Sequence, residues 1–233
     1  MNSENTENSA YSINPLGDNA LTVTFGNMIS IELNDIVLAA DAAINAAPFA
    51  GFIETVPAYS SVSVFYDPIK IRQEFPDNEA AYKAVKSLLD NILQNIPQVT
   101  HKTQNIVEIP VSFASGDALD LESLADAKGL STEEVIEIFT AQTYRVFMLG
   151  FLPGFSYMGE VDERIAMERR STPRTRVPKG SVGIAGRQTG IYSLESPGGW
   201  QIIGRTDLEM FLPGEDPPSR LRAGDTVRFV KIR

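Results

Sequence analysis

The sequence contains no cysteine and only one histidine among its 233 residues. Without cysteine the chain forms no disulfide, thiolate metal site or thiol nucleophile, which is typical of proteins kept in a reducing cytoplasm. The single histidine excludes metal sites built from several imidazoles, and no calcium-loop spacing of carboxylates occurs. It is His101, in the polar stretch 98–103, where we expect a solvated linker residue rather than a catalytic base. We therefore expect no metal.

The sequence also lacks long hydrophobic runs and an excess of positive charge. No apolar stretch reaches the ~18 residues that a membrane helix needs, and the formal net charge is −10. An acidic chain of this kind disfavours nucleic acid and anionic membranes as partners. Residues 1–10 are polar and lack the basic and apolar regions of a signal peptide, so we expect a disordered tail. These features favour a cytoplasmic protein.

The motifs of self-sufficient catalysts are missing as well. There is no Gly-Lys-Ser/Thr triplet of a phosphate-binding loop, and the glycines between 183 and 190 do not have the dinucleotide spacing. Ser156 misses the Gly-x-Ser-x-Gly nucleophile elbow by one residue. Lys179 and Ser181 suit a Ser-Lys hydrolytic pair, a weaker alternative because such pairs are common without catalysis. The catalytic residues stay unknown, and we expect no cofactor bound by this chain alone.

The first hundred residues alternate strand and helix patterns. The β-rich runs are 11–15, 20–25, 52–57, 62–66 and 106–111, and apolar residues at helical spacing lie between 33 and 44 and between 82 and 96. The order β-α-β-β-α-β predicts a ferredoxin-like, split βαβ domain. We place the domain boundary near 97–103, with an α/β domain over 11–102 and a second domain over 103–233.

The second half has a different pattern and predicts an α+β chain overall. Two short helices are expected over 120–128 and 131–142, the second with a Ser131/Glu134 capping box. After residue 143, short β runs alternate with Gly and Pro, which favours a small barrel or sandwich. The runs are 144–149, 181–185, 190–194, 201–204 and 226–232.

A basic stretch stands out in this acidic chain. Seven basic residues lie between 164 and 187, and Glu168 is the only acidic residue within that stretch. They are Arg164, Arg169, Arg170, Arg174, Arg176, Lys179 and Arg187. Prolines next to Arg174 and Lys179 stiffen the backbone, and Arg recognises carboxylates and phosphates bidentately. The stretch indicates a surface for an anionic ligand or partner; the alternative is a solvated rim paired with acidic residues elsewhere.

Two aromatic and glycine clusters flank the basic stretch, at 151–157 and 196–200. Glycines allow a ligand to approach the backbone, whose N–H groups can bind an oxyanion. The alternative is structural, with aromatic rings closing one end of the barrel. The predicted substrate-binding residues are Arg170, Arg174, Lys179, Gln188, Thr189, Tyr192, Pro197, Gly198, Gly199 and Trp200.

Five blocks together carry a family resemblance: residues 150–157, 169–174, 177–182, 188–192 and 196–206. In this order and spacing they resemble the family of the B subunit of 5-oxoprolinase, also described as allophanate hydrolase subunit 1 and as the kinase inhibitor KipI. Weaker similarity begins near residue 11 and includes 15–18 and 56–61, so the resemblance covers nearly the whole chain.

The resemblance implies an α/β N-terminal domain followed by a cyclophilin-like β-barrel. It also implies a hydrolase complex that uses ATP to open 5-oxoproline to glutamate, with a second barrel subunit (the C subunit of 5-oxoprolinase, or allophanate hydrolase subunit 2) and a third, lactam-processing subunit. The chain would then be one subunit of a hetero-oligomer acting on a small anionic substrate. The family also implies an alternative, a regulator that inhibits a sensor histidine kinase.

One position departs from the family pattern. Many relatives carry a histidine just before the strand at 144–149, where this sequence has Phe139. If that histidine serves catalysis or ligand binding, this protein has altered or lost that step. A ligand-binding barrel without activity is therefore a third interpretation.

Overall fold

The computed structural model describes residues 10–78, 80–94, 96 and 106–232. It divides into two compact units, Met1–His101 and Lys102–Arg233, which are described separately below. Most of the predicted tail at 1–10, the linker histidine His101 and the boundary stretch 97–103 lie outside the described residues.

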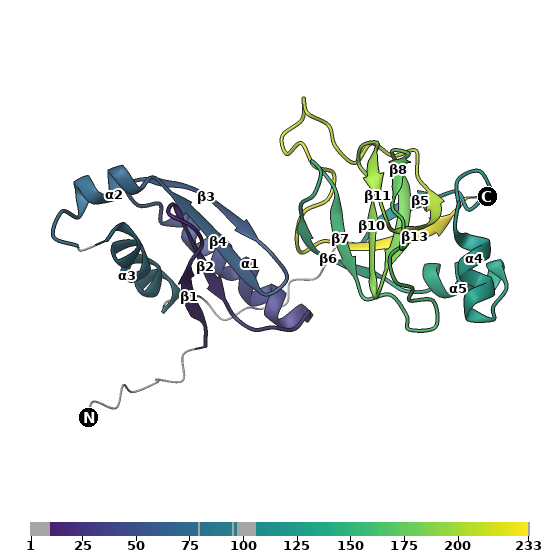
Figure 1. The fold of residues 1–233 in the computed structure, drawn as a ribbon, viewed down its shortest axis with the longest axis horizontal. Helices are drawn as coiled ribbons and strands as arrows, with labels where there is room; N and C mark the ends of the chain where they lie inside the picture. The colour runs from purple at the N-terminus through teal and green to yellow at the C-terminus, as the bar shows by residue number, and fades with distance from the viewer. Residues whose placement is uncertain (1–9, 79, 95, 97–105, 233) are drawn as a thin grey trace. The chain divides into compact units, whose positions relative to one another are not determined.

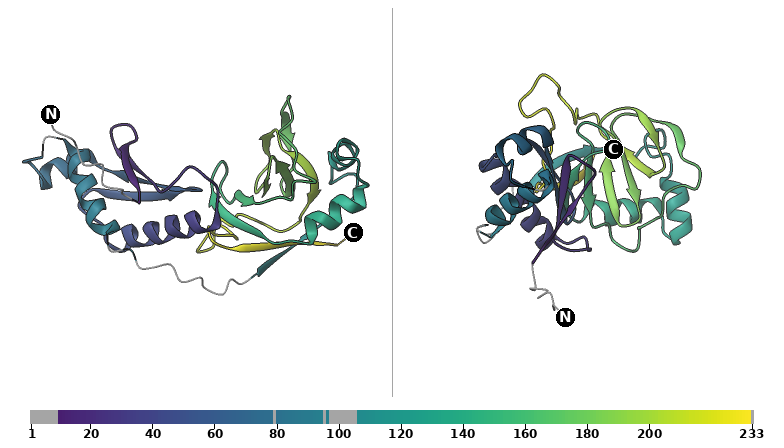
Figure 2. Two further views of the ribbon diagram at one scale, coloured as in Figure 1. Left: turned by 90° about the horizontal axis from the view of Figure 1, so that it is seen from below. Right: turned by 60° about the vertical axis from the view of Figure 1, so that its left-hand side comes forward.

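The first unit is a four-stranded antiparallel sheet with helices on one face. The strand order is β1-β2-β4-β3. Figures 1 and 2 show α1 and α3 side by side against the sheet. The strands are β1 (Ser12–Pro15), β2 (Ala20–Thr24), β3 (Phe52–Pro57) and β4 (Ser61–Tyr66), and the helices are α1 (Ile31–Ala46), α2 (Pro68–Glu74) and α3 (Ala81–Leu93).

The split βαβ arrangement is present, but its last strand is not the one the sequence predicts. β2 and β3 both run antiparallel to the intervening β4, so they are parallel to each other and joined through α1. The run Ile106–Val111 does not close this sheet, because it pairs with a strand of the second unit. β1 takes the free edge beside β2 instead. Counting Ile106–Val111 as the last strand of the split βαβ order was wrong, although the run is a strand and lies in the second unit, on the side of the predicted boundary near 97–103 where 103–233 was placed.

Alternating burial explains why these elements pack. In β4 every second residue (Val62, Val64 and Tyr66) is buried, and α1 buries Val37, Ala40 and Ile44 at helical spacing. The sequence patterns did not indicate α2, which begins with a Pro at its first turn after the N-cap Asp67. Asp67 accepts hydrogen bonds from two backbone N–H groups of that turn.

The second unit is a barrel built on a seven-stranded sheet of order β12-β9-β10-β7-β6-β13-β5 (Figure 1). β5 runs parallel to β13, and the neighbouring pairs are antiparallel. Ser112, just after β5, exchanges two backbone hydrogen bonds (2.8 and 2.9 Å) with Arg205 of β12 and so joins the two edge strands. The strands are β5 (Ile106–Val111), β6 (Tyr144–Leu149), β7 (Ser156–Gly159), β9 (Ser181–Ala185), β10 (Gln188–Ile191), β12 (Gln201–Arg205) and β13 (Thr226–Lys231).

Two helices and a two-stranded sheet complete the second unit. α4 (Leu121–Lys128) and α5 (Thr132–Thr140) pack beside the barrel, and α5 carries the predicted Ser131/Glu134 capping box. β8 (Arg174–Val177) pairs with β11 (Ser196–Gly198) outside the seven-stranded sheet. The sequence patterns did not indicate β7, β8 and β11, which are only three or four residues long. In the described part of the chain, no helix is both long enough and apolar enough to cross a membrane.

Candidate functional site

An aromatic cluster lies between the barrel and the small sheet. We use this name for Phe151, Phe155, Tyr157, Tyr192 and Trp200. Phe155 is its centre: its ring meets those of Tyr157 (4.9 Å), Tyr192 (5.3 Å) and Trp200 (5.5 Å) in edge-to-face geometry. The three bulky side chains of Phe155, Tyr192 and Trp200 are buried. The cluster is therefore a second, smaller core that supports the surface above it.

Phe151 differs from the rest of the aromatic cluster. Its side chain is 60% exposed, and its backbone φ is +68°, in the left-handed region that a bulky residue rarely adopts. Its ring contacts Phe155 at 5.5 Å edge to face. Residues with strained backbone conformations concentrate at ligand- and partner-binding sites.

Glycines bring the backbone close to the aromatic rings. A methyl group on Gly190 would lie 2.9 Å from the Phe155 ring and 3.1 Å from the Trp200 ring. A methyl group on Gly198 would overlap the Tyr192 hydroxyl. These positions require glycine because β10 and the 196–200 turn pack directly on the rings. Gly198 and Gly199 themselves are half-exposed at the surface.

A buried carboxylate holds two of the predicted arginines. Asp120 is 2% exposed and accepts hydrogen bonds from Arg174 Nη1 and Nη2 (2.7 and 2.6 Å) and from Arg170 Nη1 (2.8 Å). It also accepts from the backbone N–H of Ile202 at 2.7 Å. The Arg170 Nε is buried with no hydrogen-bond partner. Asp120 thus fixes both guanidinium groups on the aromatic cluster's side of the barrel.

The other basic side chains of the stretch are also paired, with one exception. Lys179 pairs with Glu209, Arg176 with Glu195 (2.6 Å), Arg187 with Glu160 and Glu163, and Arg164 with Asp162. Among the described residues Arg169 makes no ion pair; its guanidinium lies over the Trp200 ring, 5.8 Å from the centroid. The excess of positive charge read from the sequence is therefore largely cancelled by acidic residues, several of them far away in the chain.

The structure brings most of the predicted site residues together. Arg170 donates its backbone N–H to the Gly199 carbonyl (2.7 Å), and Arg174 lies opposite Gly198 in the β8–β11 pair. Pro197 is exposed on the same turn. The buried Tyr192 and Trp200 support these residues from below, and we call the whole group the arginine–aromatic face.

Three further predicted residues lie in or beside the barrel strands. Thr189 is fully buried and donates its hydroxyl to the Gly183 carbonyl (3.0 Å), so it belongs to the barrel wall. Gln188 lies at the start of β10, opposite Gly159 and Ala185. Lys179 pairs with Glu209.

Two residues of this region, Asp120 and Arg169, were not among the predicted site residues. Arg169 belongs to the basic stretch that the sequence shows, so it could have been included. Asp120 could not, because no local pattern links it to arginines 50 and 54 positions later in the chain.

Two tyrosines of the cluster have perturbed acidity. Burial raises the pKa of the Tyr192 phenol, and a hydrogen bond with the Trp200 backbone acts in the opposite direction. Burial also raises the pKa of the half-buried Tyr157, against the charge of nearby Arg169. Both phenols are therefore neutral hydrogen-bonding groups near neutral pH.

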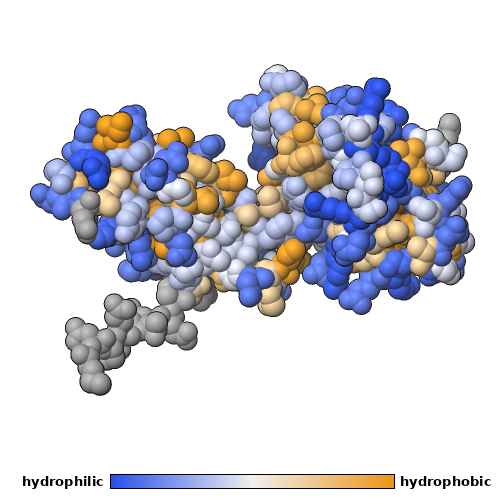
Figure 3. All heavy atoms as spheres, in the orientation of Figure 1, coloured by the Kyte–Doolittle hydropathy of each residue, from blue (hydrophilic) through white to orange (hydrophobic). Residues whose placement is uncertain are grey.

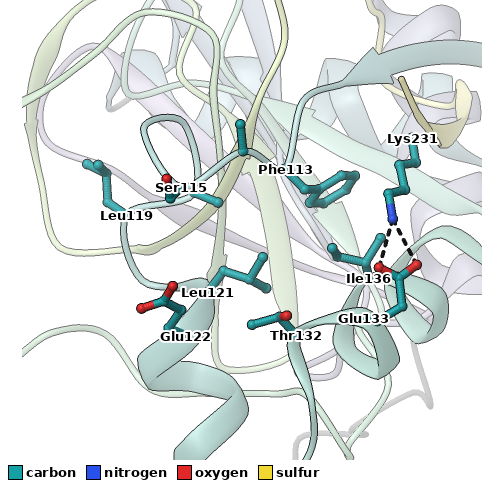
Figure 4. A pocket seen from close by; sticks show the side chains of 11 residues that line it. Phe113, Ser115, Leu119, Leu121, Glu122, Thr132, Glu133, Ile136 and Lys231 are labelled. Carbon is teal, nitrogen blue, oxygen red and sulfur yellow. Dashed lines mark hydrogen bonds and ion pairs between the residues drawn. The ribbon is translucent and has the colours of Figure 1, made fainter. Parts of the chain in front are cut away.

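A separate hollow of about 320 Å³ lies between α4, α5 and the end of β13 (Figure 4). Figure 4 shows Lys231 paired with both carboxylate oxygens of Glu133 at its rim (2.8 Å each), with Phe113, Leu121 and Ile136 on its walls. None of the ten predicted site residues lines it. The described residues contain no group of three or more His, Cys, Asp or Glu side chains arranged to hold a metal.

Phe139, the position where we expect relatives to carry a histidine, lies in the barrel core. Its ring is fully buried and stacks on Phe229 (4.8 Å) beside Tyr144 (5.1 Å). The Tyr144 hydroxyl donates to the Phe139 carbonyl at 2.7 Å. The side chain at this position packs inside the protein and does not line the arginine–aromatic face.

The fold and this face define a class of protein: a two-unit chain whose small barrel carries a face built from arginine, glycine and aromatic residues. The chain belongs to the family described as carboxyltransferase domain, subdomain C and D, whose model matches residues 11–221.

Curated relatives agree. The chain is 47% identical to the B subunit of 5-oxoprolinase from Bacillus subtilis (strain 168), over 95% of this chain and 93% of that protein. It is 49% identical to the B subunit of 5-oxoprolinase from Escherichia coli O157:H7 over 53% of this chain and 57% of that protein. The resemblance read from the sequence blocks is thereby confirmed.

Solved structures support the same family. The uncharacterised protein PH0987 from Pyrococcus horikoshii is 47% identical, with a TM-score of 0.54 over 95% of this chain and 97% of that one. TTHA0988 is 36% identical, with a TM-score of 0.78 over 92% of this chain. This chain spans only 40% of the TTHA0988 chain, so there the matching two-unit region is part of a longer polypeptide.

Proposed function

We propose that this chain is one subunit of an ATP-dependent 5-oxoprolinase, the complex that opens the lactam of 5-oxoproline to glutamate. The observation that carries this proposal is the 47% identity to the B subunit of 5-oxoprolinase from Bacillus subtilis over 93% of that protein's length. At this identity and coverage the two chains share both units rather than a single motif. The lack of cysteine favours a reducing compartment, the cytoplasm.

The arginine–aromatic face suits half of a shared site. It offers guanidinium groups and a Pro197–Gly199 turn where a ligand can approach the backbone. Asp120 holds Arg170 and Arg174 in place, so the surface around them is preorganised before a ligand binds. It provides recognition and positioning of a small anionic amide, while the face itself contains no activated nucleophile with a neighbouring base.

A partner subunit would complete the site. In TTHA0988 the region that matches this chain makes up 40% of a longer polypeptide. This supports the idea that the two-unit fold functions in contact with additional protein domains. The exposed and strained Phe151 is a suitable anchor for that contact, because aromatic residues dominate the energetics of interfaces. We expect the second barrel subunit to bind over this face and the ATP chemistry to need the assembled complex.

The test is co-expression of the chain with the second barrel subunit and the lactam-processing subunit. We expect ATP hydrolysis that depends on 5-oxoproline and yields glutamate in equal amount, measured by phosphate release and by chromatography of the amino acid. The isolated chain, assayed in parallel, should show no such turnover. Robust turnover by the chain alone would contradict its role as an incomplete subunit.

The same preparation separates the alternatives. A complex that hydrolyses allophanate or another small amide, but not 5-oxoproline, would contradict the proposed substrate and keep the hydrolase class. Association with a histidine kinase that lowers its autophosphorylation, without lactam-dependent ATP hydrolysis, would favour the regulatory interpretation. Neither activity, with the subunits assembled, would favour the inactive binding barrel.

A further inference from the structure

We propose that Arg169 binds the carboxylate of the substrate, while Arg170 and Arg174 are positioning residues that keep the surface in shape. The inference rests on the proposed function, because it takes the substrate to be a lactam that carries a carboxylate. It deepens that function by naming the recognising side chain, one that lies outside the ten substrate-binding residues expected from the sequence.

The distribution of charge separates Arg169 from its neighbours. Arg170 and Arg174 already donate to the buried Asp120 at 2.6–2.8 Å. A ligand carboxylate would have to compete for them with the preformed contacts to Asp120, whose side chain is 2% exposed, and breaking an ion pair to a buried carboxylate is costly. Arg169 is exposed and makes no ion pair among the residues that the structure describes. Its charge is therefore available to a ligand.

The backbone on both sides of Arg169 is held in place. The Glu168 carbonyl accepts a hydrogen bond from the buried Gln201 side chain (2.8 Å), and the Arg170 N–H donates to the Gly199 carbonyl (2.7 Å). Two residues earlier, the Met167 carbonyl accepts from the Gly186 N–H (2.8 Å). An arginine on an anchored segment loses little backbone entropy when it binds a ligand.

Trp200 fixes the guanidinium itself. The Arg169 Cζ lies 5.8 Å from the centroid of the Trp200 ring, within the range of a cation–π contact. Such a contact uses the face of the guanidinium and leaves its N–H groups at the edge for a carboxylate. The half-exposed Gly198 and Gly199 directly precede Trp200 and present backbone without side chains at the surface. The ligand class is a small monocarboxylate with an adjacent ring amide.

The sole tryptophan makes this testable on the isolated, full-length protein. Trp200 is the only Trp in the chain, so its fluorescence reports on the guanidinium beside it. We expect 5-oxoproline to change this fluorescence saturably. We expect 2-pyrrolidinone, the same lactam ring without the carboxylate, to produce no saturable change.

Variants assign the effect to one residue. Arg169→Met should weaken 5-oxoproline binding at least about tenfold, and Arg169→Lys, which keeps the charge but not the bidentate donor pair, should weaken it several-fold. Arg164→Met is the matched control, since Arg164 is exposed and paired with Asp162; it should bind as the unmodified protein does. Circular dichroism melts establish that each variant is folded.

The outcomes distinguish this inference from the proposed function. If Arg169→Met binds 5-oxoproline with unchanged affinity, Arg169 is not the recognising residue, and the proposed substrate stands. If acetate gives a saturable change that Arg169→Met abolishes while 5-oxoproline gives none, the carboxylate site stands and the proposed substrate fails. An equal response to 5-oxoproline and 2-pyrrolidinone, or no response to any carboxylate, overturns the inference.

Discussion

At the scale of single residues, Asp120 organises the arginine–aromatic face. Its carboxylate is 2% exposed and is shared by two guanidinium groups and one backbone N–H. It directly precedes α4 but forms no side-chain hydrogen bond to that helix. A residue whose position suggests a helix cap therefore serves a contact between distant segments instead.

We predict that Asp120→Asn lowers the free energy of unfolding by about 3 kcal/mol, because two partly exposed arginines lose the buried anion that neutralises them. Urea denaturation followed by far-ultraviolet circular dichroism measures the change. Asp126→Asn, at an exposed position of the same helix, should stay within about 0.5 kcal/mol of the unmodified protein. Equal stability of the two variants would show that the Asp120 contacts contribute no net stability.

At the scale of elements, the barrel strands depend on tight turns and close approaches. Gly180 directly precedes β9 with φ of +82°, and its N–H donates to the Tyr192 carbonyl at 2.7 Å. A methyl group there would collide with the Thr206 carbonyl oxygen. The Gly180 carbonyl also accepts a hydrogen bond from the Thr206 N–H at 2.9 Å. The turn before β9 is therefore bonded to the residue after β10 (Tyr192) and to the residue after β12 (Thr206).

Gly180→Ala should consequently destabilise the protein by more than about 1 kcal/mol, since both the left-handed conformation and the collision oppose the new side chain. Thermal and urea unfolding measure the loss. Gly116→Ala is the control, because a methyl group there meets nothing within 4 Å and its φ is not positive. A Gly180→Ala protein as stable as the control would contradict this account of the turn.

At the scale of the whole molecule, each unit has its own hydrophobic core. The core of the first unit is centred on residues such as Val37, Val64 and Leu89, and that of the second on Ile109, Phe139 and Phe229. Figure 3 shows small, separate groups of hydrophobic residues among hydrophilic ones on both units. Because each core is made within one unit, the units have the means to fold separately.

We predict that the fragment Lys102–Arg233 folds alone and unfolds cooperatively, which differential scanning calorimetry would measure. A fragment that starts at Phe113 is the control; it lacks β5, which pairs with β13 and leads to the Ser112–Arg205 closure, so it should not fold. A Lys102–Arg233 fragment without a cooperative transition would show that the second unit needs the first.

The sequence by itself determined much of the local structure and the family. Apolar spacing located four of the five helices, the Ser131/Glu134 capping box was correct, and the ordered blocks after residue 150 identified the relatives. These features are encoded within short windows, where side-chain periodicity and turn chemistry act directly on the backbone. The short strands β7, β8 and β11 offered too few residues for such a pattern.

Only the tertiary structure decided where distant residues meet. It assigned Ile106–Val111 to the barrel and β1 to the first sheet, because strand character does not specify a partner. It paired Asp120 with arginines 50 and 54 positions away, and so separated the neutralised side chains from Arg169. The sequence shows how many basic side chains a stretch contains. Whether a basic side chain is available to a ligand depends on which carboxylates the fold places beside it.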